Sequence, residues 1–214
     1  LNYIALLGWN PQGEQEKFSL EELVKEFDPR RISKSPAIFD VQKLRHLNAE
    51  YIRDMSIEQF LETAKPYIAQ TVKSECDLML LASVLQKRCE LLTDIPEQVD
   101  FIDEMPEYDI DMYNNKKMKT NPENSKTALE AVLPVLEAIS EEEWTMENIH
   151  EKLFALIAEM EVKNGTVLWP VRTALSGKQF TPGGAIEIAY ILGKDECISR
   201  MKKGIEKLFC KSNP

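Results

Sequence analysis

The sequence predicts an all-α protein, a helical bundle or cage of two or three small helical subdomains in tandem. Apolar residues recur at helical spacing through most of the 214 residues. No hairpin turn and no alternation of strand and helix patterns is present in the sequence. No internal repeat is evident, which argues against a solenoid. We expect three modules, residues 1–65, 66–139 and 140–214.

Two short helices are predicted near the start of the chain. Ser19 and Glu22 fit a capping box, a pair of side chains that bond to the free backbone N–H groups of a helix start. An extended basic connector, residues 30–39, leads to Asp40, the expected N-cap of the second helix. The first helix should bury Leu20, Leu23, Val24 and Phe27, and the second Leu44, Leu47 and Tyr51.

The middle of the chain predicts further helices. Ser56 with Gln59 caps one that ends or bends at Pro66. A longer core helix is expected from Ser74 over residues 74–92, and a short one follows over 93–104.

Residues 104–125 break the helical periodicity. They are polar and mixed in charge, and we expect a mobile surface excursion there. Lys116, Lys117 and Lys119 within it either contact an RNA backbone or are simply solvated.

Two further helices and a final one complete the pattern. Pro134 should bend the first, and either Ser140 with Glu143 or Thr145 with Asn148 begins the second. The final helix, near residues 195–209, is expected to place four basic side chains mainly outward: Arg200, Lys202, Lys203 and Lys207.

Between these helices lies the densest group of polar donors, in residues 164–193. Gly177 is the expected left-handed end of one short helix, and Thr181 with Pro182 the expected start of the next. A helix N-terminus suits an anion or the polar edge of a base. Alternatively, Arg172 pairs with a neighbouring carboxylate and the rest is capping. The donors of this group are Arg172, Ser176, Lys178, Gln179 and Thr181.

The net charge of −10 is unevenly distributed. Residues 163–214 hold nine basic and four acidic side chains, residues 30–53 hold six and two, and residues 54–162 carry −15. Basic ends around an acidic middle allow local phosphate contacts. A solvated surface of mixed charge explains the pattern as well.

Composition excludes several classes of protein. No apolar run is long enough to span a bilayer, and no signal peptide is visible. The four cysteines are 13, 108 and 13 residues apart, which fits no zinc pattern, and both histidines are isolated, so we assign no metal site. The chain starts inside an apolar run without a methionine, and we expect a piece of a longer protein.

Five segments carry a resemblance. LWPVRTALSG, TPGGAIEIAYILGK and ISRMKKGIEKL resemble the C-terminal end of bacterial glutamyl-tRNA synthetases. LNYIALLGWNPQGEQEKFSLEELVKEFD and RISKSPAIFDVQKLRHLNAEYIR are similar to the region that follows the catalytic domain of that family. The two blocks agree with the family in order and spacing.

This resemblance implies roles for particular residues. Residues of the first module would contact the tRNA stem and its phosphates: Arg30, Arg31, Lys34, Lys43 and Arg45. Residues of the other modules would read the anticodon: Arg88, Arg172, Lys178, Thr181 and Pro182. A guanidinium donates two fixed bonds to one base edge, which suits Arg88 to test a single nucleotide. A salt bridge from Arg88 to Asp94 or Glu97 is the alternative.

The resemblance also implies partners and cofactors. They are tRNA(Glu) and the enzyme's own catalytic domain, in a cytoplasmic monomer without membrane contact. ATP and Mg belong to that catalytic domain, whose signature motifs are missing from this chain. We therefore expect no cofactor and no catalytic residue here, and no ligase activity of the chain alone. The runner-up is an acidic all-α protein-interaction module; a free-standing enzyme is a distant third.

Overall fold

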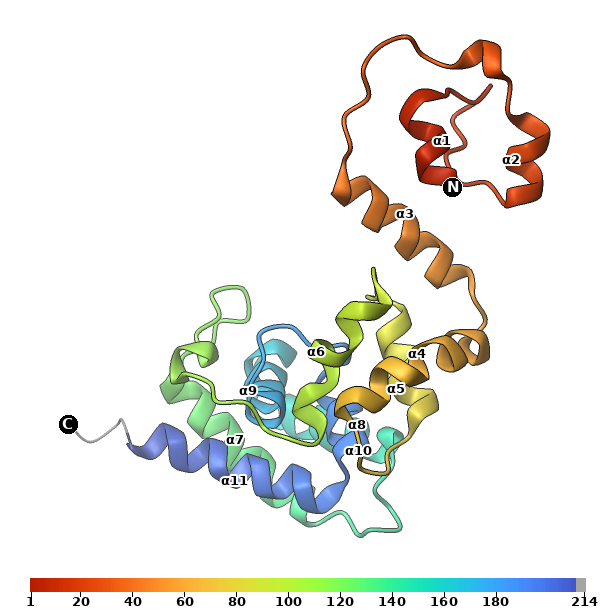
Figure 1. Ribbon diagram of the computed structural model, residues 1–214. Helices are drawn as coiled ribbons and strands as arrows, with labels where there is room; N and C mark the ends of the chain where they lie inside the picture. Colours follow the sequence, from red (N-terminus) through yellow and green to blue (C-terminus); the bar gives the residue numbers. More distant parts are fainter. Residues whose placement is uncertain (211–214) are drawn as a thin grey trace.

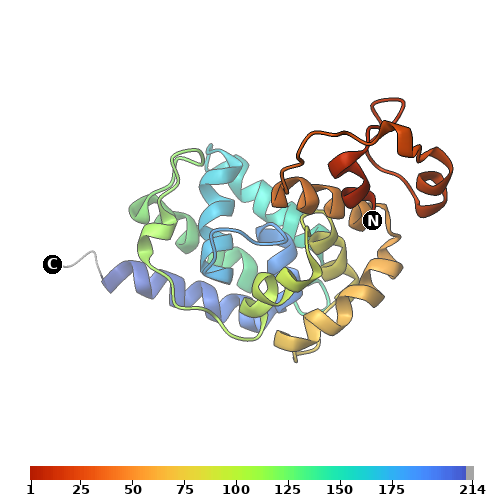
Figure 2. The same cartoon turned by 45° about the horizontal axis from the view of Figure 1, so that its top comes forward.

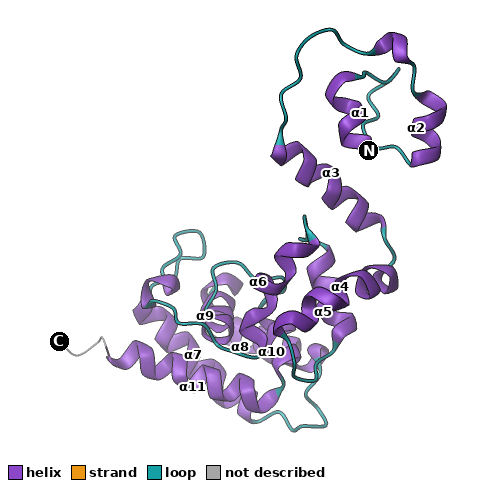
Figure 3. Cartoon of the chain, in the orientation of Figure 1, coloured by secondary structure: helices purple, strands orange, loops and turns teal. Residues whose placement is uncertain are grey.

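The computed structural model describes residues 1–210, and helices account for nearly all its regular structure (Figure 3). No strand is present in these 210 residues beyond two isolated bridges, which confirms the all-α prediction. The α-helices are α1 Asn2–Gly8, α2 Leu20–Glu26, α3 Val41–Asp54, α4 Ile57–Thr71, α5 Leu78–Gln86, α6 Ile95–Val99, α7 Pro122–Glu137, α8 Met146–Glu159, α9 Asn164–Ser176, α10 Ala185–Leu192 and α11 Lys194–Cys210. Four 3-10 turns accompany them: η1 Pro29–Arg31, η2 Leu92–Asp94, η3 Asp100–Ile102 and η4 Ile110–Tyr113.

The chain forms a small N-terminal module and a larger body, and α3 lies between them (Figure 1). The module contains α1 and α2, and the body contains α4 to α11. A view turned by 45° shows the same division (Figure 2). The two parts also have separate apolar cores, one around Trp9, Phe18 and Leu23 and one that runs from Ile52 to Leu208.

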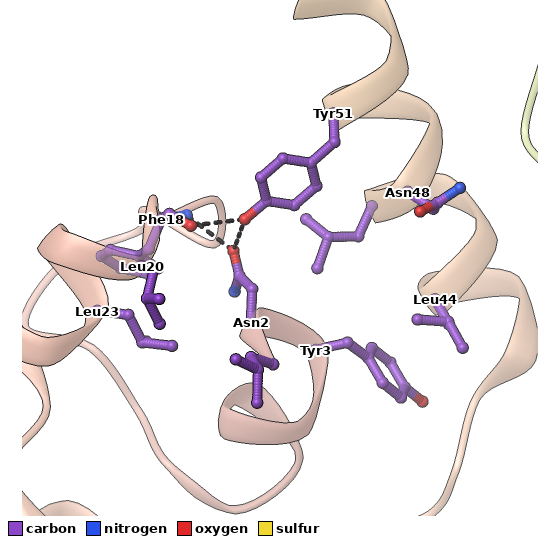
Figure 4. Close-up of a pocket in the computed structure, with 10 residues that line it drawn as sticks. Asn2, Tyr3, Phe18, Leu20, Leu23, Leu44, Asn48 and Tyr51 are labelled. Carbon is purple, nitrogen blue, oxygen red and sulfur yellow. Dashed lines mark hydrogen bonds between the residues drawn. The ribbon is translucent and has the colours of Figure 1, made fainter. Parts of the chain in front are cut away.

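A polar network closes the N-terminal module against α3 (Figure 4). The Asn2 side chain accepts a bond from the Phe18 N–H at 2.8 Å, and the Tyr51 hydroxyl lies 2.6 Å from the same oxygen. The Tyr3 hydroxyl donates to the Asp40 carbonyl at 2.8 Å and accepts from the Asp40 N–H at 2.7 Å. These bonds fix the module on the start and the last turn of α3.

The other side of α3 is bonded to the body. Asn48 donates to the Glu90 carbonyl at 2.7 Å, and Arg45 forms ion pairs with Glu90 and Asp94. Gln86, the last residue of α5, donates to two carbonyls at the end of α3. Both parts of the chain therefore hold the same helix.

Within the body, α5 and α6 both pack on α4, and α7 packs on α9 and α11. The predicted boundary between residues 139 and 140 falls between α7 and α8. The two groups of helices share the apolar core.

The capping predictions are confirmed at Ser19, Asp40, Ser56 and Thr145. The helix expected over residues 74–92 is shorter, because Asp77 accepts a bond from the Leu80 N–H and so begins α5 at Leu78.

The polar segment expected to be a mobile excursion is instead tied to α9. Trp169 donates to the Met112 carbonyl at 3.1 Å, and Thr166 donates to the Met118 carbonyl at 3.3 Å. Inside the segment, Thr120 donates to the Tyr113 carbonyl at 2.7 Å. Sequence periodicity misses these bonds because they depend on a helix about fifty residues further along the chain.

The prediction that Arg200 points outward is wrong, because only 2% of the residue is exposed. Its guanidinium donates to the carbonyls of Leu175, Phe101 and Ile102 at 2.8, 2.6 and 2.9 Å. These carbonyls end α9 and η3, where no further helical turn supplies donors. Arg200 thus caps two helix ends at once, and Glu196 balances its charge at 2.6 Å.

Candidate functional site

The candidate site is the loop of residues 177–184, which joins α9 to α10. Gly177 ends α9 with φ 60°, which confirms the predicted left-handed cap. A side chain there would also be crowded, because a Cβ atom would lie 2.9 Å from the Tyr108 ring and 3.1 Å from the Pro106 carbonyl. The chain therefore turns sharply at this glycine and enters the loop.

The predicted start of α10 at Thr181 and Pro182 is wrong. The helix begins at Ala185, and the Gly184 N–H donates to the Glu187 carboxylate at 3.1 Å. The Thr181 hydroxyl is engaged elsewhere, because it donates to the Gly183 carbonyl at 2.7 Å and accepts from Arg172. Thr181 and Pro182 are both buried, and they lie in the loop before the helix that they were expected to begin.

Arg172 projects from α9 across this loop. Its Nη1 donates to the Thr181 hydroxyl at 2.9 Å, and its Nη2 donates to the Gln179 carbonyl at 2.8 Å. The guanidinium carbon lies 4.4 Å from the centre of the Trp169 ring, three residues earlier on the helix. Two bonds and a stacked ring hold this arginine in one orientation.

Arg88 reaches the same loop from the turn after α5. Its Nη1 donates to the Thr181 carbonyl, so the two guanidiniums meet on one residue from elements 84 positions apart in sequence. The alternative salt bridge to Asp94 or Glu97 is not formed, and Asp94 pairs with Arg45 instead. Within residues 1–210, neither Arg88 nor Arg172 has a carboxylate partner.

The electrostatics follow from this geometry. Burial, and secondly the positive charge of Arg88, lower the pKa of the Arg172 guanidinium below its ordinary value. Two cations without a carboxylate raise the local potential, and an anionic or electron-rich ligand would relieve it. The arrangement is suited to phosphate or to the acceptor edge of a base.

Lys178 and Ser176 anchor the loop. Lys178 donates to the Glu97 carbonyl at 2.6 Å and pairs with Asp100 at 2.6 Å. The Ser176 hydroxyl donates to the Arg172 carbonyl at 2.8 Å and accepts from the Lys178 N–H at 3.2 Å. Both side chains are thus bonded within the protein.

Sequence reasoning overlooked two aromatic residues at this site, Trp169 and Phe180. Trp169 has a signal in the sequence, since it stands three residues before Arg172 and shares its helix face. Phe180 stands alone between polar residues, and no periodicity marks it. Its side chain is 81% exposed.

The five basic residues expected to contact the tRNA stem are dispersed over the N-terminal module and α3. Arg30 pairs with Asp28 at 2.9 Å, and Lys43 pairs with Glu16 at 2.6 Å. Arg31 donates to the Pro11 carbonyl at 2.6 Å, and Arg45 has the two carboxylates given above. Lys34 is exposed, on the connector before α3. The described contacts join none of the five to the arginine pair.

A pocket of about 360 Å³ lies between the N-terminal module and α3 (Figure 4). Five of its ten lining residues are leucines, and the Asn2, Phe18 and Tyr51 network forms one wall. In the described part of the chain, no group of three His, Cys, Asp or Glu residues could hold a metal ion. None of the helices described is long and apolar enough to cross a membrane.

Comparison with known proteins gives one family match and several relatives. The family described as "Anticodon binding domain" matches residues 59–205. The chain is 56% identical to a glutamate–tRNA ligase of Clostridium botulinum (strain Eklund 17B / Type B) and 58% identical to one of Clostridium tetani. Each alignment covers 97% of this chain, but only 43% and 42% of those proteins.

Solved structures agree with this similarity. A glutamate tRNA ligase from Elizabethkingia meningosepticum in complex with its amino acid matches with a TM-score of 0.77 and 30% identity. A glutamate-tRNA synthetase from Elizabethkingia anophelis matches with a TM-score of 0.76 and 29% identity. The alignments cover 97% and 96% of this chain, and 40% and 39% of those chains.

Proposed function

The chain belongs to the anticodon-binding domain family, and from this premise we propose that it binds the anticodon arm of tRNA(Glu) as the C-terminal region of a glutamate–tRNA ligase. The observation that carries the proposal is the pair of guanidiniums, Arg88 and Arg172, that meet at Thr181 without a carboxylate. The glutamate–tRNA ligase relatives support the choice of tRNA. The acidic interaction module has no comparable observation in its favour.

The mechanism follows from the donors that the two arginines retain. A guanidinium has five N–H groups. Arg88 uses one on Thr181, and Arg172 uses one on Thr181 and one on Gln179. The remaining donors face no acceptor in the described chain, and a splayed anticodon base or its phosphate supplies acceptors of suitable geometry. We assign Arg88 to one anticodon position and Arg172 to a base or phosphate next to it.

Thr181, Pro182 and Lys178 contribute by shaping the loop. The Thr181 hydroxyl and the Lys178 ammonium are both bonded within the protein, and Pro182 is buried. We propose that these three residues hold the backbone on which the bases are read. Such fixed support reduces the entropy lost on binding.

The N-terminal module has an apolar surface that nothing in residues 1–210 covers. Val24, which belongs to the apolar stripe of α2, is 74% exposed, and Ile38 on the connector before α3 is 88% exposed. The chain spans less than half the length of the Clostridium relatives. We propose that this surface packs on the catalytic part of a longer, monomeric and cytoplasmic enzyme, which would hold ATP and Mg and join glutamate to the tRNA. In that enzyme Arg30, Arg31, Lys34, Lys43 and Arg45 would meet the tRNA stem.

The test is binding of the chain to a hairpin RNA with the anticodon arm of tRNA(Glu), over a salt series. Arg172→Ala should weaken binding at least about tenfold, because it removes a charge and a fixed fork of donors. Arg172→Lys should recover only part of the loss, since an ammonium lacks that fork. Arg53→Ala removes the same charge from α3, where Arg53 pairs with Glu50, and is the matched control.

Specificity is tested with a second hairpin whose anticodon is altered and whose stem is unchanged. The wild-type chain should prefer the original hairpin, and Arg88→Ala should reduce this preference more than it reduces overall affinity. Equal affinity of the wild-type chain for both hairpins would contradict anticodon reading. Equal loss in Arg53→Ala and Arg172→Ala would show that net charge alone drives binding.

A further inference from the structure

Phe180 is an exposed aromatic ring at the tip of the candidate site. Its 81% exposure exceeds that of Phe27, Phe39 and Phe209, the other phenylalanines that reach the surface to a large extent. An apolar ring of this size in water is unfavourable and adds nothing to the packing of the fold. The packing of the fold therefore gives no reason for a phenylalanine at this position.

The backbone on both sides of Phe180 is held in place. Arg172 bonds to the Gln179 carbonyl at 2.8 Å and to the Thr181 hydroxyl at 2.9 Å, so one guanidinium grips the residue before the ring and the residue after it. Arg88 bonds to the Thr181 carbonyl as well. Lys178 ties the start of the loop to Glu97 and Asp100. The ring is thus presented on a fixed support.

The neighbours of the ring decide which ligand it suits. The residues that flank it bond to two guanidiniums that have no carboxylate partner in the part of the chain that the structure describes. An apolar segment of a protein would place its surface beside these cations without neutralising them. An unpaired nucleotide offers a flat aromatic face for the ring and a phosphate for the guanidiniums. Stacking on an aromatic ring is possible for any base.

We infer that Phe180 is a stacking platform for one unpaired nucleotide of the anticodon loop, next to the nucleotides that Arg88 and Arg172 contact. This inference rests on the proposed function and assigns a further binding residue to the same site. The ring supplies a planar face, whereas the arginines supply donors and charge. Recognition by shape and recognition by hydrogen bonding are thereby divided between adjacent side chains.

The experiment measures affinity for the same hairpin RNA with Phe180→Ala and Phe180→Trp. Stacking on one base should make Phe180→Ala bind about tenfold more weakly, while Phe180→Trp keeps the affinity. The salt dependence should be unchanged in both, because no charge is removed. Phe209→Ala, which removes an exposed ring from the last turn of α11, is the matched control and should bind like the wild-type chain.

A second series identifies the stacked base. Each unpaired loop nucleotide is replaced in turn by an abasic one, and the effect of Phe180→Ala is measured on every hairpin. At one position the Phe180→Ala effect should vanish, since the base that it contacts is gone, and at the others it should persist.

The outcomes separate this inference from the function on which it rests. If the wild-type chain does not bind the hairpin, the proposed function fails and this inference fails with it. If the wild-type chain binds and Phe180→Ala binds equally well, only the stacking role is overturned. A loss in Phe180→Ala that is the same on every abasic hairpin, or a lower unfolding temperature of this variant, would show a structural role and also overturn it.

Discussion

Arg172 and Arg200 show how two arginines of one fold differ in use. Arg200 is surrounded by carbonyls from Phe101, Ile102 and Leu175, and Glu196 balances its charge. Arg172 is stacked on Trp169 and forms no ion pair with a carboxylate in residues 1–210. The first arrangement satisfies the side chain within the protein, and the second leaves donors for a ligand.

Removal of the Arg200 side chain should therefore destabilise the protein. We expect Arg200→Ala to lower the free energy of unfolding by about 3 kcal/mol, because buried carbonyls at two helix ends lose their donors. Urea denaturation measures this change. Lys203→Ala removes an exposed cation from the same helix and should change stability by less than about 0.5 kcal/mol. Similar values for both variants would contradict the capping role.

At this scale the sequence identifies residues whose role is local. The capping roles of Gly177 and Asp40 can be predicted from residues within a few positions of each in the sequence. Arg200 does not, because its acceptors at Phe101 and Ile102 lie about a hundred residues away and only the folded chain brings them to it. The same holds for Arg88, whose partner Thr181 belongs to the other half of the body.

At the scale of the elements, the sequence predicts most helices and is less successful with their ends. α5 and α10 both begin later than expected. In α5 the N-cap is Asp77, and in α10 the expected cap, Thr181, is engaged by Arg172. A local pattern is compatible with several starts; a local cap selects the start of α5, whereas a bond from another helix engages the expected cap of α10.

The cap of α5 can be tested directly. Asp77→Ala should lower the free energy of unfolding by about 1 kcal/mol, because the Leu80 N–H loses its acceptor. Glu75→Ala removes one negative charge just before the helix and should have a smaller effect. The measurement is thermal or urea unfolding followed by circular dichroism. If Glu75→Ala were equally destabilising, charge would be the cause and not the cap.

The end of α9 gives a second test. Gly177→Ala should cost about 1 to 2 kcal/mol from the left-handed backbone alone. The crowding by Tyr108 and Pro106 adds to this cost. Gly13→Ala is the control, since nothing lies within 4 Å of a Cβ atom at that position. Because Gly177 leads into the loop proposed to bind RNA, hairpin affinity should fall in Gly177→Ala and stay constant in Gly13→Ala.

At the scale of the whole molecule, burial of a thiol in the shared core should make the free energy of unfolding fall at alkaline pH. Burial raises the pKa of the Cys197 thiol to about 12, from an ordinary value of 9.0. Unfolding exposes the thiol, which then ionises near its ordinary pKa. The stability that this group contributes is therefore fully present below pH 9 and is lost as the pH rises towards 12.

We expect the free energy of unfolding of the wild-type chain to fall across this range. The slope due to one thiol reaches about 1.4 kcal/mol per pH unit. Cys197→Ala should show a shallower decline, whatever its stability at neutral pH, because alanine does not titrate. Cys89, whose pKa burial raises to about 11, remains in both proteins and contributes equally. Parallel curves for the two proteins would contradict the prediction.

The whole molecule also shows where sequence patterns are incomplete. The stripe of α2 predicts burial, yet Leu20 and Val24 are exposed while Leu23 is buried. Apolar spacing marks residues that favour burial, and on the proposed function the exposed ones would be covered by the catalytic part of the enzyme. The structure distinguishes the apolar residues that are buried in the fold from those that stay exposed, and the sequence pattern alone does not.

The length of α3, the single helix between the two parts, sets the distance between them. Its 14 residues span about 21 Å, and the module and the body are each bonded to it along its length. The length of α3 thereby determines the spacing between the basic residues near one end and the arginine pair in the body. An insertion of four residues in α3 would move the module by about 6 Å and turn it by more than a full revolution, so a rigid ligand that touches both parts could no longer fit. On the proposed function, the number of residues in α3 therefore contributes to recognition of the RNA together with the side chains.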